Sequence, residues 1–519
     1  MELTPEQYFD ETLRLRAVAQ KTGIAESDIT HIEIRRSSLD SRRGVHYRVR
    51  ADVYVAPEGY TEEPIVSPYR DCSNCAEVVI VGAGPAGMFA ALRALEVGLR
   101  PVVVERGEAV QQRSKDITAM VHSGHVNPNS NWCFGEGGAG TYSDGKLFTR
   151  STKRGNVQEV LRKFVEHGAD NKILIETHAH IGTDRLHSIV SNIRHTVEQH
   201  GGEYHFGSQV DDLVVRNGAA CGVHCNDGAT YTGVAVVLAT GHSARDIFDL
   251  FERRKLTLQA KPFAVGVRVE HPQALINEIQ YHGRDHSPLL PPATYSLTTQ
   301  VDGHGVFSFC MCPGGVIVPA ATADGEQVVN GMSNASRSSA FANSGIAVTV
   351  SPADIGADAT DAMSMLRFQR SIEQAACHAS GGGLTAPAQS MTDFCRGKTT
   401  VTLRRTNYMG KCCTAPLHEV LPPFVVSCLQ RAFKDYDRKM RGFYTAEATL
   451  LAVESRTSSP VRIPRTVQGE QIDLPGLYPC GEGAGYAGGI TSSALDGINT
   501  IDCIARKMGL LESSLANQR

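Results

Sequence analysis

Apolar residues change their spacing along residues 77–107 in a way that separates strands from a helix. The segment begins with an unbroken apolar run, Val78–Val81, continues with apolar residues at helical spacing, and ends with a second run, Val102–Val104. Short unbroken apolar runs are typical of strands buried on both faces, and the stretch between them is long enough to form a crossover helix. The pattern therefore predicts a strand–helix–strand unit.

Three glycines occupy the turn between the first strand and this helix. Gly82 permits a tight turn, Gly84 lets a pyrophosphate approach the backbone, and Gly87 lets the helix pack closely on the strand. Glu105 ends the second strand, where a carboxylate accepts hydrogen bonds from ribose hydroxyl groups and repels a 2′-phosphate. The unit predicts binding of FAD or NAD rather than NADP. A glycine-rich loop before an ordinary helix is the alternative.

The spacing of apolar and polar residues along the whole chain predicts an α/β fold and divides the chain into domains. Near the N-terminus, a capped helix from Pro5 and two alternating stretches, His31–Arg36 and Val45–Val55, predict a helix with a hairpin. We expect a small N-terminal α+β module (residues 1–70), a Rossmann-type FAD-binding domain in two parts (71–260 and 445–519), and a substrate domain between them (261–444).

Two segments that end in glycine support FAD as the cofactor. Val234–Leu238 runs into Ala-Thr-Gly241 and resembles the end of flavin-binding Rossmann domains, where this turn lies near the adenosine. Leu474–Ile490 resembles the closing segment of the fumarate reductase and succinate dehydrogenase flavoprotein superfamily. That resemblance implies that Glu482 binds the ribityl chain and that N–H groups near Gly488 and Gly489 face N1 and O2 of the isoalloxazine. Amides at a helix N-terminus stabilise negative charge there.

Four further segments resemble a largely uncharacterised bacterial and plastid family of FAD-dependent dehydrogenases, also described as NAD(P)/FAD-dependent oxidoreductases. They are Asn131–Leu147, Phe309–Gly315, Asn330–Ser344 and Ala452–Ile463, so the resemblance spans nearly the whole chain. It implies a cofactor and states no substrate.

The resemblance also implies that the loop 137–146 lies across the flavin's pyrophosphate and ring. Gly138 would allow close backbone approach, and Thr141 and Ser143 would supply hydroxyl donors. A purely structural glycine turn is the alternative.

Three arginines are the predicted catalytic and substrate-binding residues. Arg456 and Arg462 lie in a hydroxyl-rich stretch before the closing segment, and Arg337 lies in the middle of the chain. Arginine presents a planar fork that clamps carboxylates and stays charged when desolvated. An internal network, for example between Glu454 and Arg456, would use the same residues structurally.

The sequence predicts FAD bound without a covalent link. His122 and His125 lie upstream of the flavin loop, but the residues around them do not match a flavin attachment motif. No second glycine-turn unit opens a domain for NAD(P)H. Electrons are therefore expected to come from the substrate, from transiently bound NAD(P)H, or from a protein carrier.

Composition excludes several classes of partner. A net charge of −4 gives no broad reason to bind nucleic acid, and the apolar runs are far shorter than the ~18 residues of a membrane span. The N-terminus is acidic where a signal peptide would be basic, so we expect a cytoplasmic protein. The fourteen cysteines are expected to be free thiols, and the single CxxC lacks the second pair that a zinc ribbon needs, so no metal site is predicted.

The predicted function is an FAD-dependent oxidoreductase that transfers hydride between flavin N5 and a small or medium organic substrate. Dehydrogenation and reduction of an activated double bond both remain open. Alternatives are an O₂-using oxidase or monooxygenase, a flavin-bearing protein without catalysis, and thiol redox chemistry at Cys133 or Cys480.

Overall fold

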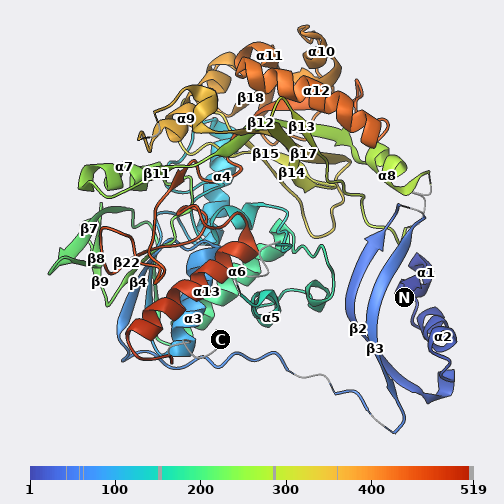
Figure 1. The fold of residues 1–519 in the computed structure, drawn as a ribbon, viewed down its shortest axis with the longest axis horizontal. Coiled ribbons are helices and arrows are strands. Elements are labelled where there is room, and N and C mark those ends of the chain that lie inside the picture. Colours follow the sequence, from blue (N-terminus) through green and yellow to red (C-terminus); the bar gives the residue numbers. More distant parts are fainter. Residues whose placement is uncertain are drawn as a thin grey trace.

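The computed structural model describes residues 1–42, 44–57, 59–61, 64–149, 155–283, 288–358 and 360–512. They form three parts: a parallel-sheet domain, a seven-stranded domain above it, and an N-terminal module at the side (Figure 1). Along this described chain no helix is long and apolar enough to cross a membrane.

The parallel-sheet domain contains the strand–helix–strand unit that the sequence predicts. Its sheet has the order β22-β10-β4-β5-β6, and every neighbouring pair is parallel. The strands are β4 (Glu77–Val81), β5 (Arg100–Val104), β6 (Glu203–His205), β10 (Val236–Leu238) and β22 (Leu477–Pro479). A small antiparallel sheet beside it contains β7 (Val210–Arg216), β8 (Ala219–Cys225) and β9 (Thr230–Thr232).

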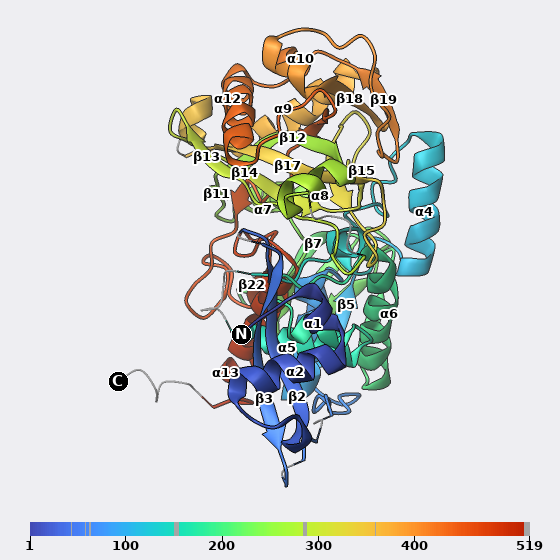
Figure 2. The ribbon, with the colours of Figure 1, turned by 90° about the vertical axis from the view of Figure 1, so that its right-hand side faces the viewer.

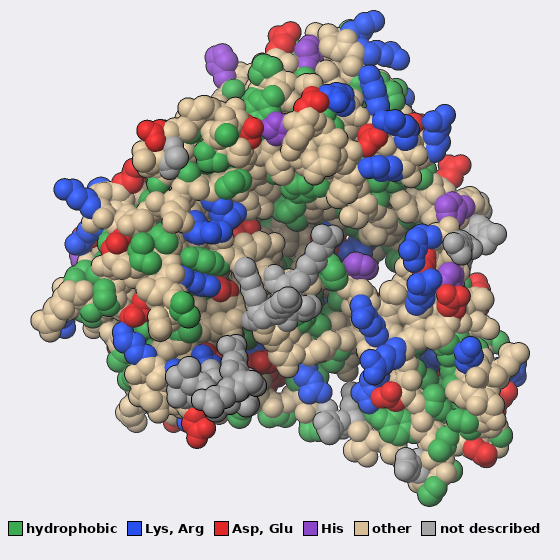
Figure 3. All heavy atoms as spheres, viewed as in Figure 1, with side chains coloured by type: hydrophobic (Ala, Val, Ile, Leu, Met, Phe, Trp, Pro, Cys, Tyr) green, Lys and Arg blue, Asp and Glu red, His purple; other side chains and the backbone are tan. Residues whose placement is uncertain are grey.

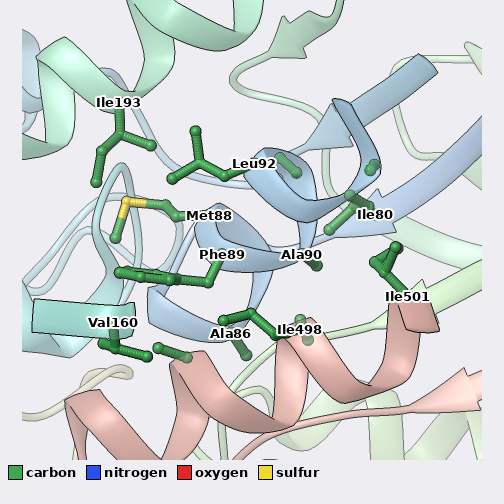
Figure 4. Packing of buried hydrophobic residues seen from close by; sticks show 14 of the residues in the cluster. Ile80, Ala86, Met88, Phe89, Ala90, Leu92, Val160, Ile193, Ile498 and Ile501 are labelled. Atoms are coloured by element: carbon green, nitrogen blue, oxygen red, sulfur yellow. The ribbon is translucent and has the colours of Figure 1, made fainter. Parts of the chain in front are cut away.

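Helices cover the parallel sheet and form its core. They are α3 (Pro85–Val97), α5 (Val157–Glu166), α6 (Thr183–Gln199), α7 (Arg245–Arg254) and α13 (Ile490–Lys507). Helix α4 (Val110–Ser123) instead packs through Ile117 and Met120 on Val318 and Leu384 of the seven-stranded domain. Helix α3 begins at Gly84 with Pro85 in its first turn and ends at Gly98 in the left-handed conformation. Phe89 of α3 packs between Val160 of α5 and Ile498 of α13, so the C-terminal helix completes the core of the first unit (Figure 4).

The seven-stranded domain has the order β13-β14-β17-β12-β20-β18-β19. Its strands are β12 (Phe263–Pro272), β13 (Thr298–Val301), β14 (His304–Cys312), β17 (Phe341–Val350), β18 (Thr385–Ser390), β19 (Lys411–Thr414) and β20 (Thr449–Glu454). Its helices are α8 (Gln273–Tyr281), α9 (Ser364–Ala379), α10 (Met391–Arg396), α11 (Leu417–Val420) and α12 (Pro423–Lys439). Two short pairs join β15 (Val316–Pro319) to β16 (Val329–Met332) and β11 (Gln259–Ala260) to β21 (Val461–Arg462).

The boundary expected at residue 445 needs correction. Strand β20 lies within the segment 445–519 that we assigned to the FAD-binding domain, yet it pairs with β12 and β18 in the seven-stranded sheet. Its six residues are all buried, as in a central strand rather than a linker. The return to the parallel-sheet domain therefore follows Glu454.

The N-terminal module is a three-stranded antiparallel sheet with two short helices. Its elements are β1 (Glu2–Leu3), α1 (Pro5–Phe9), α2 (Glu11–Thr22), β2 (Ile29–Asp40) and β3 (His46–Val55). Thr4 and Gln7 form the expected capping box, but the helix is interrupted at Asp10, which caps α2. Figure 2 shows the module lying against the parallel-sheet domain and below the seven-stranded domain.

Two contacts join the module to the other domains. The backbone of Ser37 in β2 donates to Ile175 at 2.8 Å and accepts from Thr177 at 2.9 Å, which makes one rung of a strand pairing with the parallel-sheet domain. His282, after α8, lies 2.9 Å from the carbonyl oxygen of Ser41. The module therefore bridges the two larger domains.

Candidate active site

A large cavity opens where the three parts meet. Its volume is about 1860 Å³, and its wall runs from Glu105 past the turn after β4 to the N-terminus of α13, the bulged end of strand β14 (residues 308–312) and strand β2. Typical small-molecule sites enclose roughly 300–1,000 Å³. The cavity therefore has room for a cofactor and a second molecule.

The three glycines of the turn after β4 differ in their surroundings. Gly82 has φ +104, and a Cβ there would meet the carbonyl oxygen of Ala239 at 2.5 Å. A Cβ on Gly87 would lie 1.9 Å from the carbonyl oxygen of Gly82, and Gly87 does not line the cavity. A Cβ on Gly84 would have only the Cα of Gly138 within 4 Å, at 3.8 Å. Gly82 and Gly87 thus permit close packing, while Gly84 exposes bare backbone to the cavity.

Glu105 lies at one end of the cavity and ties three loops together. Its Oε2 accepts from the N–H of Ala83 at 2.8 Å, and its Oε1 accepts from Gly107 and Gly135, both at 2.9 Å. The residue is 5% exposed. A carboxylate has roughly four acceptor positions, so one remains on Oε2 for a ribose hydroxyl.

The loop predicted to cross the flavin forms a 3₁₀ turn, η2 (Gly138–Tyr142). Gly138 has φ +59 and lines the cavity together with Ser143, whose hydroxyl is held by the backbone of its own turn. Thr141 does not line the cavity: it is buried and donates to the carbonyl oxygen of Glu136 at 3.3 Å. The prediction that Thr141 donates to the flavin is therefore corrected, because the turn directs its side chain into the protein.

Gly241 and Glu482 meet on the wall next to His242. Gly241 has φ +70 and open space around its Cα, and the imidazole Nε2 of His242 lies 3.7 Å from Oε1 of Glu482. Burial raises the pKa of Glu482 to about 7, although Lys261 lowers it. Burial lowers the pKa of His242 to about 3, and Arg456 adds to this shift. The imidazole is therefore uncharged at neutral pH, and the pair is not an ion pair.

The N-terminus of α13 opens into the cavity. Gly488, Gly489 and the first turn of the helix, residues 490–493, form part of its wall. The N–H of Gly488 donates to Ser492 at 3.2 Å, so this group is already paired. The first N–H groups of any α-helix lack an intrahelical acceptor and carry partial positive charge. Those of α13 therefore face the cavity as donors for an anionic or electron-rich group.

These residues fit FAD. The bare backbone at Gly84 and Gly138 leaves space for a diphosphate, Glu105 retains an acceptor for a ribose, and α13 offers amides for the N1/O2 side of the ring. When bound, the cofactor would supply redox chemistry at its isoalloxazine ring.

Arg456 is held in a buried ion network and is corrected as a substrate ligand. Its Nε and Nη2 donate to Glu373 at 3.2 and 3.1 Å, Nη2 donates to Glu326 at 3.2 Å, and Nη1 donates to Ser243 and Thr322 at 3.2 and 2.9 Å. A guanidinium has five N–H groups, and all five are used. Arg456 touches the cavity wall, but it has no donor left for a substrate.

Arg462 also differs from its prediction. It lies on β21, exposed and outside the cavity wall, with its guanidinium carbon 5.5 Å from the ring centre of Tyr486. Strand β21 pairs with β11, which turns alternate side chains outward. Arg462 therefore cannot contact a molecule in this cavity without a rearrangement.

Arg337 is the one predicted arginine whose side chain remains available at the cavity. It has φ +49 and lines the wall, and its Nε and Nη2 bind the two oxygens of buried Asp144 at 3.1 and 2.5 Å. Asp144 also pairs with Lys146 at 3.0 Å, and Ser333 donates to it. Burial raises the pKa of Asp144, but Lys146 and Arg337 outweigh this effect and lower it to about 2.

Comparisons with known proteins agree with this arrangement. Residues 76–260 match the family model described as pyridine nucleotide-disulphide oxidoreductase, and residues 262–457 match that of the FAD-dependent protein, C-terminal domain-like. Residues 1–54 match a domain of unknown function. A protein of Clostridium beijerinckii, named only as uncharacterized, is 38% identical over 517 residues, which cover 95% of this chain and 96% of the relative.

The chain belongs to a family of FAD-dependent oxidoreductases. This confirms the predicted cofactor class, fold class and enzyme class, whereas the link to fumarate reductase has no support from the matches.

Solved structures resemble the oxidoreductase only distantly. A halogenase in complex with FAD has a TM-score of 0.40 at 11% identity, covering 84% of this chain and 69% of that one. A geranylgeranyl bacteriochlorophyll reductase-like protein from Thermoplasma acidophilum has a TM-score of 0.37 at 11% identity, and the match covers 84% of this chain and 79% of that one. A salicylate hydroxylase complex has a TM-score of 0.34 at 11% identity, and the match covers 84% of this chain and 80% of that one. Likeness at this level says nothing about the reaction of this oxidoreductase.

Lys146 and Cys310 were not among the residues predicted for the site. Cys310 has φ +42 at a bulge of β14, so its side chain is exposed on the cavity wall. Lys146 donates to the carbonyl oxygen of Met311 in the same bulge. Both residues lie within the segments that carry the family resemblance, 131–147 and 309–315, which was the available signal.

The histidines and cysteines considered from the sequence are distributed differently. His122 and His125 do not line the cavity. Of the two cysteines considered for thiol redox chemistry, Cys480 is fully buried away from the wall, whereas Cys133 lines it, with its Sγ 3.6 Å from the carbonyl oxygen of Ala320. In the described part of the chain, no group of three or more metal-binding side chains occurs.

Proposed function

We propose that this oxidoreductase binds FAD non-covalently and transfers hydride between flavin N5 and an organic substrate held in the same cavity. The observation that carries the proposal is the shared cavity itself. Its glycine turn and the α13 N-terminus suit the cofactor, and the space beyond them is lined by Lys146, Cys310 and Arg337. A cavity of about 1860 Å³ exceeds what one ligand usually needs.

The chain's own groups would position the reactants. The N–H groups of the first turn of α13 would stabilise negative charge on the reduced ring, and this requires no reorganisation because the helix is packed along its whole length. Asp144 fixes the guanidinium of Arg337, so that its remaining donors keep one direction. Either redox direction suits this arrangement, and transient NAD(P)H is our proposed donor where the substrate is reduced.

Flavin absorbance under anaerobic conditions tests the proposal. The purified protein, loaded with FAD, is mixed with NADH, NADPH or a panel of organic acids and alcohols, and bleaching near ~450 nm reports reduction directly. We expect bleaching by at least one donor, and the bleaching rate should depend on Arg337 and be unaffected by Arg462→Gln. A flavin that dithionite reduces but no donor does would argue against an enzyme. Product oxygenation after admission of air would favour a monooxygenase.

A further inference from the structure

We infer that the substrate is an amphipathic monocarboxylic acid, whose carboxylate binds Arg337 and Lys146 and whose apolar body lies against the N-terminal module. The inference rests on the proposed function and names the substrate class of that site.

The charges around Asp144 leave one positive charge for a ligand. Arg337 and Lys146 both contact this carboxylate, so two cations are balanced by one anion. The neighbouring His180 adds no charge at neutral pH, because burial and Arg337 lower its pKa to about 4. Among the described residues, Nε and Nη2 of Arg337 each donate once to Asp144, which leaves the second N–H of Nη2 and both N–H groups of Nη1 without an acceptor. Arg337, Lys146 and Asp144 together carry a net charge of +1, and Arg337 offers a forked donor.

That charge favours a carboxylate over a phosphate. A phosphate monoester carries about −1.5 to −2 at pH 7, whereas a carboxylate carries −1 and accepts two parallel N–H bonds from one guanidinium. The side chain of Arg337 is 11% exposed and that of Lys146 is 38% exposed, so both can be reached from the cavity. A dianion would leave one negative charge uncompensated in this partly buried position.

The N-terminal module contributes three apolar or aromatic side chains to the wall of the same cavity, beside three serines. Phe9 and Leu39 line it together with Tyr47, and Phe148 lines it from the parallel-sheet domain. Phe9 is 52% exposed and Phe148 is 50% exposed, which places them among the exposed large hydrophobic side chains of the described chain. Exposed apolar side chains gathered from separate domains around one opening are typical of a ligand-binding surface. This assigns the module a role in holding the substrate.

The segment 176–180 of the parallel-sheet domain sets how far strand β2 of the module lies from the Arg337 loop. Ser37 of the module pairs with Glu176, and His180 lies 3.2 Å from the carbonyl oxygen of Ala335 in the Arg337 loop. Glu176 and His180 are four residues apart, so their Cα atoms are separated by at most about 14 Å. A ligand with a short chain or an aromatic ring beyond its carboxylate would reach from the Arg337 loop toward strand β2.

The entrance also favours an acid. Figure 3 shows Lys and Arg side chains gathered where the N-terminal module meets the rest of the molecule. A groove on the module is lined by Arg36, Arg48 and Arg50 and by Glu2, which pairs with Arg48 at 3.5 Å, and Ser38 lines both this groove and the cavity. Clustered cations beside an opening raise the local concentration of anions and their association rate.

Binding to the oxidised, FAD-loaded protein tests the inference without turnover. The probes are 4-phenylbutyrate, its neutral amide, and the phosphate ester of 3-phenylpropanol, titrated by calorimetry. We expect the carboxylate to bind roughly ten- to a hundred-fold more tightly than the amide, as for a charged hydrogen bond, and more tightly than the phosphate. Equal affinity for acid and amide, or a preference for the phosphate, would overturn the inference.

Variants separate the head group from the body. Arg337→Gln should remove the preference for the acid and leave amide binding unchanged, and Lys146→Gln should reduce that preference by a smaller factor. Arg462→Gln is the matched control, because Arg462 lies outside the cavity. Phe9→Ser should weaken acid and amide equally. If Arg337→Gln proves unfolded, Lys146→Gln and Phe9→Ser still test the head-group and body contacts. An unchanged preference for the acid over the amide in Lys146→Gln would contradict the proposed carboxylate site.

The two proposals can fail independently. Tight acid binding in a protein whose flavin no donor reduces would refute the proposed hydride transfer and leave the binding site intact. Flavin reduction by neutral substrates, with no preference for acids, would refute the inference and leave the oxidoreductase proposal intact.

Discussion

Gly84 and Gly138 approach so closely that a Cβ added to Gly138 would lie 3.0 Å from the Cα of Gly84. The first belongs to the turn before α3 and the second to η2, so two loops 54 residues apart in sequence form one bare backbone surface on the cavity. A cradle without side chains is what a diphosphate needs when it binds to backbone N–H groups.

Gly84→Asp should abolish FAD binding and leave the apoprotein folded. A Cβ at position 84 meets nothing closer than 3.8 Å, so the protein tolerates the side chain, but the added carboxylate repels the diphosphate. The ratio of flavin to protein absorbance and the thermal midpoint of the apoprotein measure the two effects separately.

Gly87→Ala is the matched variant in the same turn. Its Cβ would lie 1.9 Å from the carbonyl oxygen of Gly82, so we expect a loss of apoprotein stability even without cofactor. Full flavin content in Gly84→Asp would place the cofactor elsewhere, and an unchanged thermal midpoint in Gly87→Ala would contradict the close packing of α3 on β4.

The turn around Gly84 could be predicted from sequence because its causes are local. The glycines, Pro85 and the apolar run before them fix strand, turn and helix within about twenty residues. Arg456 shows the limit of this reasoning. Its partners Glu373 and Glu326 lie 83 and 130 residues away in the sequence, and only the packing of the seven-stranded domain brings them together.

Thr141 and Cys310 were misjudged or missed for a related reason. The family resemblance locates the loops that carry them, but the direction of a side chain depends on the backbone conformation of the turn. In η2 that conformation buries Thr141, and at the bulge of β14 a φ of +42 turns Cys310 into the cavity. Spacing in the sequence does not encode either angle.

The protein should purify with FAD that acid precipitation releases. His122 and His125, the upstream histidines, do not line the cavity and therefore cannot attach the ring. We expect yellow supernatant after trichloroacetic acid treatment, with FAD identified by chromatography. A yellow pellet, or FMN in the supernatant, would be incompatible with this prediction.

Glu270 should make the protein less stable as the pH rises from about 4.5 to 7. Burial raises the pKa of this carboxyl group to about 7 from an ordinary value of 4.5, although the N–H of Asn407 donates to both of its oxygens. In that pH window the folded state keeps a proton that the unfolded state releases, so unfolding becomes easier as the pH increases. Above pH 7 the whole of this loss in free energy of unfolding applies.

Glu270→Gln removes this titration. The difference between an ordinary pKa of 4.5 and a pKa of about 7 corresponds to about 3 kcal/mol, so the variant should gain up to that much free energy of unfolding relative to wild type between pH 5 and pH 8. Urea denaturation of wild type and Glu270→Gln at several pH values measures the difference in free energy of unfolding between them. The contributions of the other titrating groups are the same in both proteins and cancel in this difference. A difference that does not change with pH would show that Glu270 is already ionised in the folded protein at pH 5.

Arg456→Lys should destabilise the fold rather than slow the reaction selectively. The guanidinium is 6% exposed and pairs with Glu373 and Glu326, whose side chains are 0% and 2% exposed. Burial by itself raises the pKa of Glu373, yet Arg456 and Arg245 lower it to about 2, so this carboxylate stays charged and requires its partners. Lysine retains one charge but cannot direct five N–H groups, and the carboxylates lose hydrogen bonds that no water replaces.

Breaking a buried ion pair typically costs about 3–5 kcal/mol, and we expect Arg456→Lys to lose a substantial part of that free energy of unfolding. Urea denaturation of the FAD-loaded protein measures it, and exposed Arg462→Lys, which should change stability by less than about 0.5 kcal/mol, is the control. If Arg456→Lys keeps wild-type stability and flavin content but binds the carboxylate probe more weakly, then Arg456 and not Arg337 recognises the substrate. The corrected assignment of these two arginines therefore depends on measuring stability and binding in the same variant.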